Sequence, residues 1–313
     1  MTDSTTALRR IVAATDFSPA AELAVARAAQ LAAAAGATLT LVHVLPVSVW
    51  KDTVAIVADL YLHRPTPYDP HQLEAETQVK LDALAADLRT RHGVECRARW
   101  RSGRPAAEIA AAATEAGADL LVIGAHGAHR MHEWLLGTTT QKLARMALCP
   151  LLVVRKPAVA PYATVLVPTD LSAPSAQAAR FAAAVFPQAD FHVAHAWQLP
   201  YEGLLRYAGA DSAAIETYRT QADARLRAAL ADFIAGVGFA GGRAVPHVRH
   251  GYPPRAIDDW IRALGADLVV LAAQGKSDLA ATFLGSVSLH VLHAAPCDVL
   301  LVRGGAGAQS PAQ

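Results

Sequence analysis

The amino-acid sequence predicts an α/β protein made of two tandem, open, parallel five-stranded sheets flanked by helices. Three observations lead to this fold class. Short β-branched runs alternate with alanine-rich stretches of helical periodicity, apolar runs such as DLLVI are nearly continuous, and one pattern occurs twice along the chain. The alternation implies crossover connections and a parallel sheet, and a continuous apolar run is typical of a strand buried on both faces.

The internal repeat is visible in three pairs of segments. IVAATDFSP returns as VLVPTDLSAP, GADLLVIG at 117–124 returns as GADLVVLA at 265–272, and LLVVR at 151–155 returns as VLLVR at 299–303. The last two pairs share an offset of 148 residues. The break between the copies falls at KPAVAPY, so we expect one domain over residues 1–156 and a second over residues 162–305.

Each copy is expected to follow the same order of elements. In the first copy we expect helices near 18–35, 70–92, 104–116 and 138–147, and strands near 10–15, 38–44, 94–100, 119–123 and 151–155. In the second copy we expect strands near 164–169, 190–196, 243–249, 267–272 and 298–302. Asp69 and Pro70 fit a cap and first-turn pair, and Gly93 fits a stop signal. Residues 46–68 and 198–210 are expected to form loops over one end of each sheet.

Composition and charge restrict the classes of partner. The chain has 313 residues, is 53% hydrophobic and carries a formal net charge of +1, so it can bury large cores and has no strong attraction for nucleic acid or anionic membranes. Its first residues, MTDSTTALRR, lack the apolar core of a secretory signal, and no apolar run approaches the roughly 18 residues of a membrane span. Cys96, Cys149 and Cys297 show no CxxC spacing and are expected to be reduced thiols. We therefore expect a cytoplasmic protein.

Two aspartates lie where an open parallel sheet binds its ligands. Ligands of such sheets bind beyond the carboxyl ends of the strands, where the strand order reverses. Asp16 and Asp170 follow the first strand of each copy. A carboxylate there can accept hydrogen bonds from a ribose or a base, and it could equally cap the next helix.

The stretch GAHGAHRMHEWLLGTTT, which begins at Gly124, fits a phosphate-binding turn. Gly124 and Gly127 permit close approach of a ligand to the backbone. Gly137 opens a helix whose free N–H groups and dipole attract an anion. Thr138 and Thr140 add hydroxyl donors, so the stretch predicts a phosphate cradle.

Two other interpretations of this stretch are a metal site and a plain connection between a strand and a helix. His126, His129 and His132 are spaced every third residue, which suggests zinc, but no cysteine or carboxylate pattern accompanies them. We therefore expect no metal. His126 is expected to line the loop or face solvent, and Arg130 is a candidate phosphate contact.

The spacing G124-A-H-G127, nine residues, then G137-T138 resembles the Gly-x2-Gly-x9-Gly-Ser/Thr signature of nucleotide-binding universal stress proteins. The resemblance covers nearly the whole chain, twice, and extends to the TD-x-S, LVHV, VAHA, LCPLLVV and PCDVLLV segments. It implies a Rossmann-like fold, similar to the adenine nucleotide alpha hydrolases, that binds ATP or another adenine nucleotide. By the same analogy the final strands of two domains pack together, so one chain would form a pseudo-dimer; a further homodimer stays open.

The second copy departs from this signature. Ala272 stands at the position of the first glycine, followed by Gly275, nine residues, and Gly285. The methyl group of Ala272 obstructs the approach that glycine allows, so we expect the nucleotide mainly in the first copy. The candidate nucleotide-binding residues are Asp16, Val44, Gly124, His126, Gly127, Arg130, Gly137, Thr138, Thr139, Thr140, Asp170, Gly275, Gly285, Ser286 and Ser288.

The sequence predicts a binding site more clearly than a reaction. No Ser-His-Asp order or paired-carboxylate pattern stands out. His43 and His195, which end the second strands, are either acid–base candidates or hydrogen-bonded packing residues. We expect a regulatory stress-response protein that is not an enzyme. The alternative is a weak ATPase or nucleotide-dependent transferase in which His126 or His129 orients a water.

Overall fold

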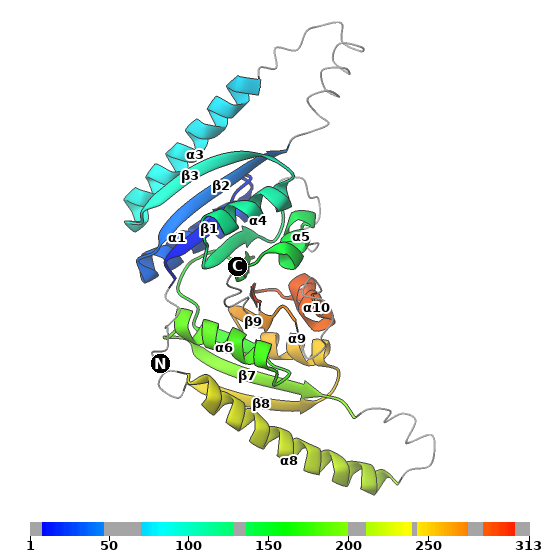
Figure 1. Cartoon of the computed structure of the whole chain (residues 1–313). Helices are drawn as coiled ribbons and strands as arrows, with labels where there is room; N and C mark the ends of the chain where they lie inside the picture. Colours follow the sequence, from blue (N-terminus) through cyan, green and yellow to red (C-terminus); the bar gives the residue numbers. More distant parts are fainter. Residues whose placement is uncertain are drawn as a thin grey trace, which may run out of the picture. The chain divides into compact units, whose positions relative to one another are not determined.

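The computed structural model of the chain describes residues 8–46, 70–127, 136–199, 211–239, 243–274 and 284–303 (Figure 1). The chain divides into two compact units, one formed by Leu8–Val159 and the other beginning at Ala160. The loops expected at 46–68 and 198–210 lie almost wholly outside the described residues, as does the expected cap Asp69.

The first unit contains a parallel sheet whose described strands follow the order β3-β2-β1-β4-β5. The strand order reverses between β1 and β4, so their carboxyl ends lie side by side at the edge where such sheets bind ligands. The strands are β1 (Arg10–Ala14), β2 (Thr38–Pro46), β3 (Cys96–Gly103), β4 (Leu120–Gly124) and β5 (Leu151–Val154).

Helices cover both faces of this sheet. Helix α1 packs against β1 and β4 and contacts α3, whereas α4 packs against β2 and contacts α5 (Figure 1). The strands between them are therefore apolar on both faces, and the side chains of Leu120, Leu121 and Val122 in β4 are all buried. The helices are α1 (Pro19–Ala35), α3 (Pro70–His92), α4 (Pro105–Glu115) and α5 (Thr138–Met146).

Local sequence signals set the ends of the helices. The Ser18 side chain caps α1 by accepting a hydrogen bond from the Ala21 N–H at 3.2 Å, and Pro19 follows at the first helical position. Gly36 ends α1 in the left-handed region at φ 64°. Gly93 follows α3 at φ 66°, which confirms it as the stop signal.

Strands β2 and β3 extend further at their carboxyl ends than the sequence predicts, and β3 begins at Cys96, later than the expected start at 94. They pair in register from Leu39 opposite Cys96 to Pro46 opposite Gly103. The expected strands end at 44 and 100, whereas β2 continues to Pro46 and β3 to Gly103. The cross-strand pairing supplies the hydrogen bonds that the local sequence does not specify.

The second unit repeats this plan, with described strands in the order β10-β9-β6-β7-β8, all parallel. Its strands are β6 (Thr164–Pro168), β7 (Asp190–Trp197), β8 (Ala244–His250), β9 (Leu268–Ala272) and β10 (Asp298–Val302). Its helices are α6 (Ala173–Val185), α8 (Ser212–Val237), α9 (Pro253–Leu264) and α10 (Ser286–Ala294). The fold class predicted from the sequence is confirmed.

The repeated GAD tripeptide has a structural role in both units. The Asp119 carboxylate accepts hydrogen bonds from the N–H groups of Arg9 and Arg10 at 2.8 and 2.9 Å. Asp267 accepts the equivalent bonds from Ala163 and Thr164 at 3.1 and 3.0 Å. The aspartate therefore ties the start of the first strand to the segment that leads into the fourth.

Two further properties bear on the class of protein. No helix among the described residues is long and apolar enough to cross a bilayer. No disulfide joins Cys96, Cys149 and Cys297, and burial raises the pKa of the Cys96 and Cys149 thiols to about 11. These two thiols are therefore protonated and weakly reactive near neutral pH.

Candidate functional site

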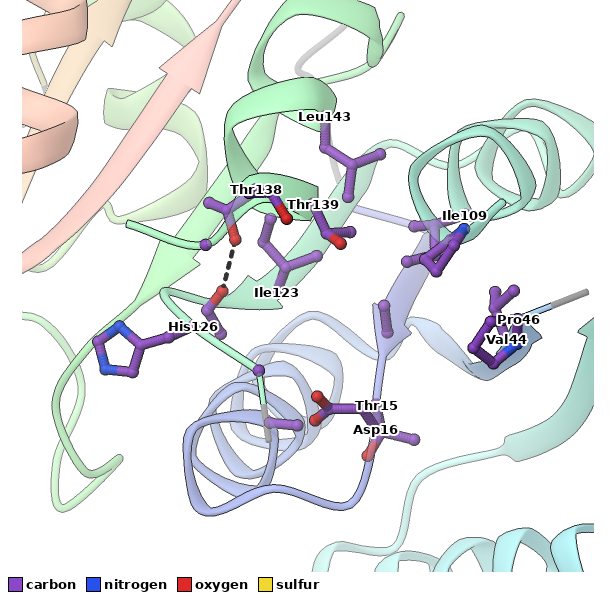
Figure 2. Close-up of a pocket in the computed structure, with 17 residues that line it drawn as sticks. Thr15, Asp16, Val44, Pro46, Ile109, Ile123, His126, Thr138, Thr139 and Leu143 are labelled. Carbon is purple, nitrogen blue, oxygen red and sulfur yellow. Dashed lines mark hydrogen bonds between the residues drawn. The ribbon is translucent and has the colours of Figure 1, made fainter. Parts of the chain in front are cut away.

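A cavity of about 370 Å³ lies at the carboxyl ends of β1 and β4 in the first unit (Figure 2). Its volume is within the range of small-molecule sites. Elements far apart in sequence supply the lining residues, which include Thr15, Asp16, Val44, Pro46, Pro105, Ile109, Ile123, Gly124, His126, Gly127, Gly137, Thr138, Thr139, Thr140 and Leu143. The structure therefore brings together all of the described first-unit candidates.

Asp16 occupies a tight turn between β1 and α1. Its Oδ1 atom accepts hydrogen bonds from the Ser18 N–H at 3.1 Å and the Ser18 hydroxyl at 2.5 Å. Ser18 is the residue that caps α1, so Asp16 supports the helix cap through one oxygen. The carboxylate is nevertheless exposed and lines the cavity, so capping does not prevent contact with a ligand.

Gly124 is a glycine because helix α1 approaches it closely. A Cβ atom at this position would lie 2.6 Å from the carbonyl oxygen of Ala20 and 3.1 Å from the nitrogen of Ala21. The sequence suggested that the missing side chain makes room for phosphate. The structure supplies a different reason, the packing of the first turn of α1 on the end of β4.

Gly127 and Gly137 are constrained by the walls of the cavity. A Cβ atom on Gly127 would lie 2.6 Å from Oδ2 of Asp16, which places the loop after β4 directly beside the carboxylate. Gly137 donates its N–H to the Ala125 carbonyl at 2.8 Å, and a Cβ there would lie 3.3 Å from that oxygen. A side chain at Gly127 would therefore push the Asp16 carboxylate aside, and one at Gly137 would crowd the Ala125 carbonyl.

The N-terminus of α5 faces the cavity with Thr138 and Thr139 (Figure 2). The first hydrogen bond of the helix runs from the Gln141 N–H to the Gly137 carbonyl at 2.9 Å. The N–H groups of the three threonines before Gln141 have no acceptor within the helix, as is general for the first turn. Thr140 is buried, and its hydroxyl donates to the Gly124 carbonyl at 3.0 Å. Its hydroxyl therefore holds α5 to β4, in contrast to the free donor that the sequence suggested.

One wall of the cavity is apolar, and sequence reasoning missed most of it. Val44 and Pro46 come from the end of β2, and Pro105 and Ile109 come from the first turns of α4. Figure 2 shows Ile109, Val44 and Pro46 on the side of the cavity away from His126. The sequence predicts the helix itself near 104–116, but only the fold shows that Pro105 and Ile109 on its first turns line the cavity.

His126 lines the cavity, but its ring extends away from Asp16 and Ile109 (Figure 2). Arg130, His129 and His132 lie outside the described residues. Within the described part of the chain, no group of three His, Cys, Asp or Glu side chains could hold a metal ion.

A second cavity of about 260 Å³ lies at the equivalent place in the second unit. Asp170, Ala272, Gly285, Ser286 and Ser288 line it, with Pro168, Thr169, Ser175, Ala194, His195, Ala196, Pro253, Ile257, Leu271, Gln274 and Val287. The Ser288 hydroxyl donates to the Ala272 carbonyl at 2.8 Å, as Thr140 does to Gly124. Gly275 lies outside the described residues.

The second cavity differs in the polar groups around its aspartate. Oδ1 of Asp170 accepts hydrogen bonds from the N–H and hydroxyl of Ser172, at 3.1 and 2.5 Å, and from the hydroxyl of Ser175 at 2.5 Å. Ser175 stands where the first unit has Ala21, and Val287 stands where it has Thr139. The N-terminus of α10 therefore offers this cavity one hydroxyl fewer than the N-terminus of α5 offers the first cavity.

Comparison with known proteins gives the family. A model described as the universal stress protein family matches residues 7–155 and again residues 161–303. Universal stress protein YxiE of Bacillus subtilis is 32% identical over 87 residues, and Universal stress protein Sll1388 of Synechocystis is 48% identical over 56 residues. These stretches are 26% and 18% of this chain and span 59% and 36% of the two relatives.

Solved structures show the same fold along nearly the whole chain. A universal stress protein from Archaeoglobus fulgidus has a TM-score of 0.64 at 17% identity, covering 95% of this chain and 98% of that one. A functionally unknown protein from Pseudomonas aeruginosa has a TM-score of 0.65 at 19% identity, covering 96% and 95%. With both copies of the pattern matched, the chain belongs to the universal stress protein family and carries its domain twice in tandem.

Proposed function

We propose that this protein binds an adenine nucleotide, ATP in the first instance, as a regulatory stress-response protein, with the nucleotide held mainly in the first unit. The observation that carries the proposal is the first-unit cavity, which combines an apolar wall with a polar end. A nucleotide has the same two parts, a flat apolar base and a charged phosphate chain. Val44, Pro46, Pro105 and Ile109 offer the surface for the base.

The polar end of the cavity suits the ribose and the phosphates. The Asp16 carboxylate can accept hydrogen bonds from ribose hydroxyls, and Gly127 lies beside it. The first turn of α5 directs N–H groups and the positive end of the helix dipole toward the same space. Thr138 is exposed there, so its hydroxyl is accessible to a phosphate oxygen.

Two differences support a preference for the first unit. Its cavity is larger, about 370 against 260 Å³, which favours the bulkier triphosphate. Its helix carries Thr139 where the second unit has Val287, and an isopropyl group cannot hydrogen-bond to phosphate. The second unit is proposed as the weaker site.

The output of nucleotide binding is proposed to be a change in the surface offered to a partner, not turnover of the nucleotide. The protein is proposed to act in the cytoplasm, where thiols that form no disulfide stay reduced. The pseudo-dimer within one chain, and any homodimer, also belong to this proposal. Analytical ultracentrifugation with and without ATP measures whether one chain or two sediment together.

Calorimetric titration of ATP into the full chain tests the proposal. We expect one strong site per chain, a retained nucleotide in the mass spectrum of the purified protein, and no multiple-turnover release of phosphate. An absence of adenine-nucleotide binding up to millimolar ligand would refute the binding function. Steady phosphate release that disappears in His126→Ala would instead establish an enzyme.

A further inference from the structure

His43 makes a hydrogen bond that fixes its tautomer. Its Nδ1 atom lies 2.8 Å from the carbonyl oxygen of Thr15, the residue before Asp16. A carbonyl oxygen only accepts, so Nδ1 carries the proton and donates. Burial, the largest influence, lowers the pKa of His43, while the bond to Thr15 and the charge of Asp16 raise it. The ring is therefore neutral near pH 7, with its single proton committed to Thr15.

The backbone that this bond holds is an unfavourable turn. Phe17 has φ 59°, a left-handed conformation that residues other than glycine seldom adopt. Two contacts support the turn from inside: the Thr15 hydroxyl accepts from the Phe17 N–H at 3.1 Å, and Asp16 accepts from Ser18. His43 supports it from β2, where its ring also packs against the Phe17 ring with centroids 5.0 Å apart.

The second unit repeats the arrangement with a different side chain in the turn. His195 Nδ1 lies 2.8 Å from the Thr169 carbonyl oxygen, and the Thr169 hydroxyl accepts from the Leu171 N–H at 2.9 Å. Leu171 has φ 64°, although it has no aromatic ring to stack on the histidine. The hydrogen bond from the histidine to the carbonyl is therefore the common feature, and the ring contact is an addition in the first unit.

We infer that His43 is a positioning residue, which holds the turn so that the Asp16 carboxylate faces the cavity. The inference rests on the proposed function only for its effect on ATP. Without the Nδ1–H donor, the Thr15 carbonyl loses this hydrogen bond. The turn then keeps one hydrogen bond to β2, from the Thr15 N–H to the Val42 carbonyl at 2.9 Å, which lies before Asp16 and Phe17. Asp16 then samples orientations that do not face the ligand, and binding must select among them.

Two amide variants separate the donor from the bulk of the side chain. His43→Asn carries its NH₂ group near the position of Nδ1, whereas His43→Gln carries it one carbon further, near Nε2. Both keep a polar side chain on β2. His92→Gln, at the last residue of α3 in the same unit, is the matched control for an equal change away from the cavity.

Two readouts are needed, calorimetric titration of ATP into the full chain and backbone hydrogen exchange at Phe17 and Ser18 by NMR. We expect His43→Gln to weaken ATP binding about tenfold and to speed exchange at both amides. His43→Asn should stay within about threefold of the wild type, as should His92→Gln. Equal losses in the Asn and Gln variants, or wild-type behaviour of His43→Gln, would overturn the inference.

The exchange readout keeps the inference distinct from the proposed function. If the wild-type chain binds no ATP, the proposed function fails, and the exchange rates of the Asn and Gln variants alone decide the positioning role. If His43→Gln does not fold, the His195→Asn and His195→Gln pair tests the same hydrogen bond through exchange at Leu171. Faster exchange in the Gln variant only would support the inference, and equal exchange in both would reject it.

Discussion

Gly124 and Ala272 occupy equivalent positions at the ends of β4 and β9, yet a methyl group fits only the second. In the first unit it would lie within 2.8 Å of both backbone atoms of the Ala20 carbonyl group. Ala272 is almost fully buried and still carries its side chain. The close packing of α1 against β4 therefore requires a glycine at position 124, whether or not a ligand also contacts it.

This packing predicts a stability effect that needs no ligand. Gly124→Ala should lower the free energy of unfolding by about 1–3 kcal/mol, because the added methyl group must push the first turn of α1 away from the sheet. Urea unfolding of the ligand-free chain measures it. Ala272→Gly is the reciprocal control and should cost only about 0.5–1 kcal/mol. Unchanged stability of Gly124→Ala, combined with weaker ATP binding, would show that the glycine serves the ligand alone.

The sequence predicted Asp16 as a residue at the site and left two roles open. The structure shows that one oxygen accepts from Ser18, while the carboxylate also lines the cavity and lies beside Gly127. The sequence alone cannot show that one oxygen of Asp16 supports the helix cap while the other lies beside Gly127, because both oxygens belong to the same side chain. The same limit applies to Thr140, whose hydroxyl is directed at the Gly124 carbonyl by the folded geometry.

At the scale of elements, the second unit contains a histidine pair that the first lacks. Nδ1 of His192 on β7 lies 2.9 Å from Nε2 of His247 on β8, and Trp260 of α9 lies over His247 with ring centroids 6.2 Å apart. The first unit has Thr40 and Arg99 at the matching places. Because one nitrogen must accept in this hydrogen bond, the pair cannot hold a proton on both facing nitrogens.

The histidine pair predicts a loss of stability in mild acid. Burial lowers the pKa of both rings; the charge of Asp190 opposes this at His192, and His192 lowers the pKa of His247 further. The nearby Arg249 and Asp259 neutralise each other at 2.8 Å. Since the folded pKa values lie below the unfolded value of about 6.5, the unfolded chain takes up more protons. The contribution of the pair to the free energy of unfolding is therefore fully present above that pH, and it is lost as the pH drops below it.

A variant that copies the first unit tests this effect. His192→Thr removes one ring and keeps a side chain suited to a strand. Denaturant unfolding between pH 7.5 and 5 should show a flatter pH dependence for His192→Thr than for the wild type. His250→Gln, on β8 but outside the pair, should keep the steeper pH dependence. Superimposable pH profiles for the wild type and His192→Thr would exclude the pair as the source.

At the scale of the whole molecule, one plan is used twice, and that plan was predictable. The parallel strands and their flanking helices could be predicted because buried strands and alanine-rich helices differ in the periodicity of their apolar residues. The apolar wall formed by Pro46, Pro105 and Ile109 was not predictable in the same way. Pro46 lies far from Pro105 and Ile109 in the chain, and only the pairing of β2 with β3 and the packing of α4 on β2 bring them together.

The two-copy plan makes each unit the control for the other. Asp16 corresponds to Asp170, Ile109 to Ile257, and the N-terminus of α5 to that of α10. Differences in ligand binding must therefore come from the positions that differ, such as Val44 against Ala196 and Thr139 against Val287. Thr138 and Ser286 are the most useful pair to change, because both are exposed first residues of nine-residue helices.

The central claim is that the first unit holds the nucleotide, and ATP titration into Thr138→Glu and Ser286→Glu full-length chains tests it most directly. A carboxylate suits the first turn of a helix, so both variants should fold, while each repels a phosphate at its own cavity. We predict that Thr138→Glu weakens ATP binding at least about tenfold and that Ser286→Glu stays within about threefold of the wild type. Equal losses in the two variants, or a loss confined to Ser286→Glu, would contradict the account.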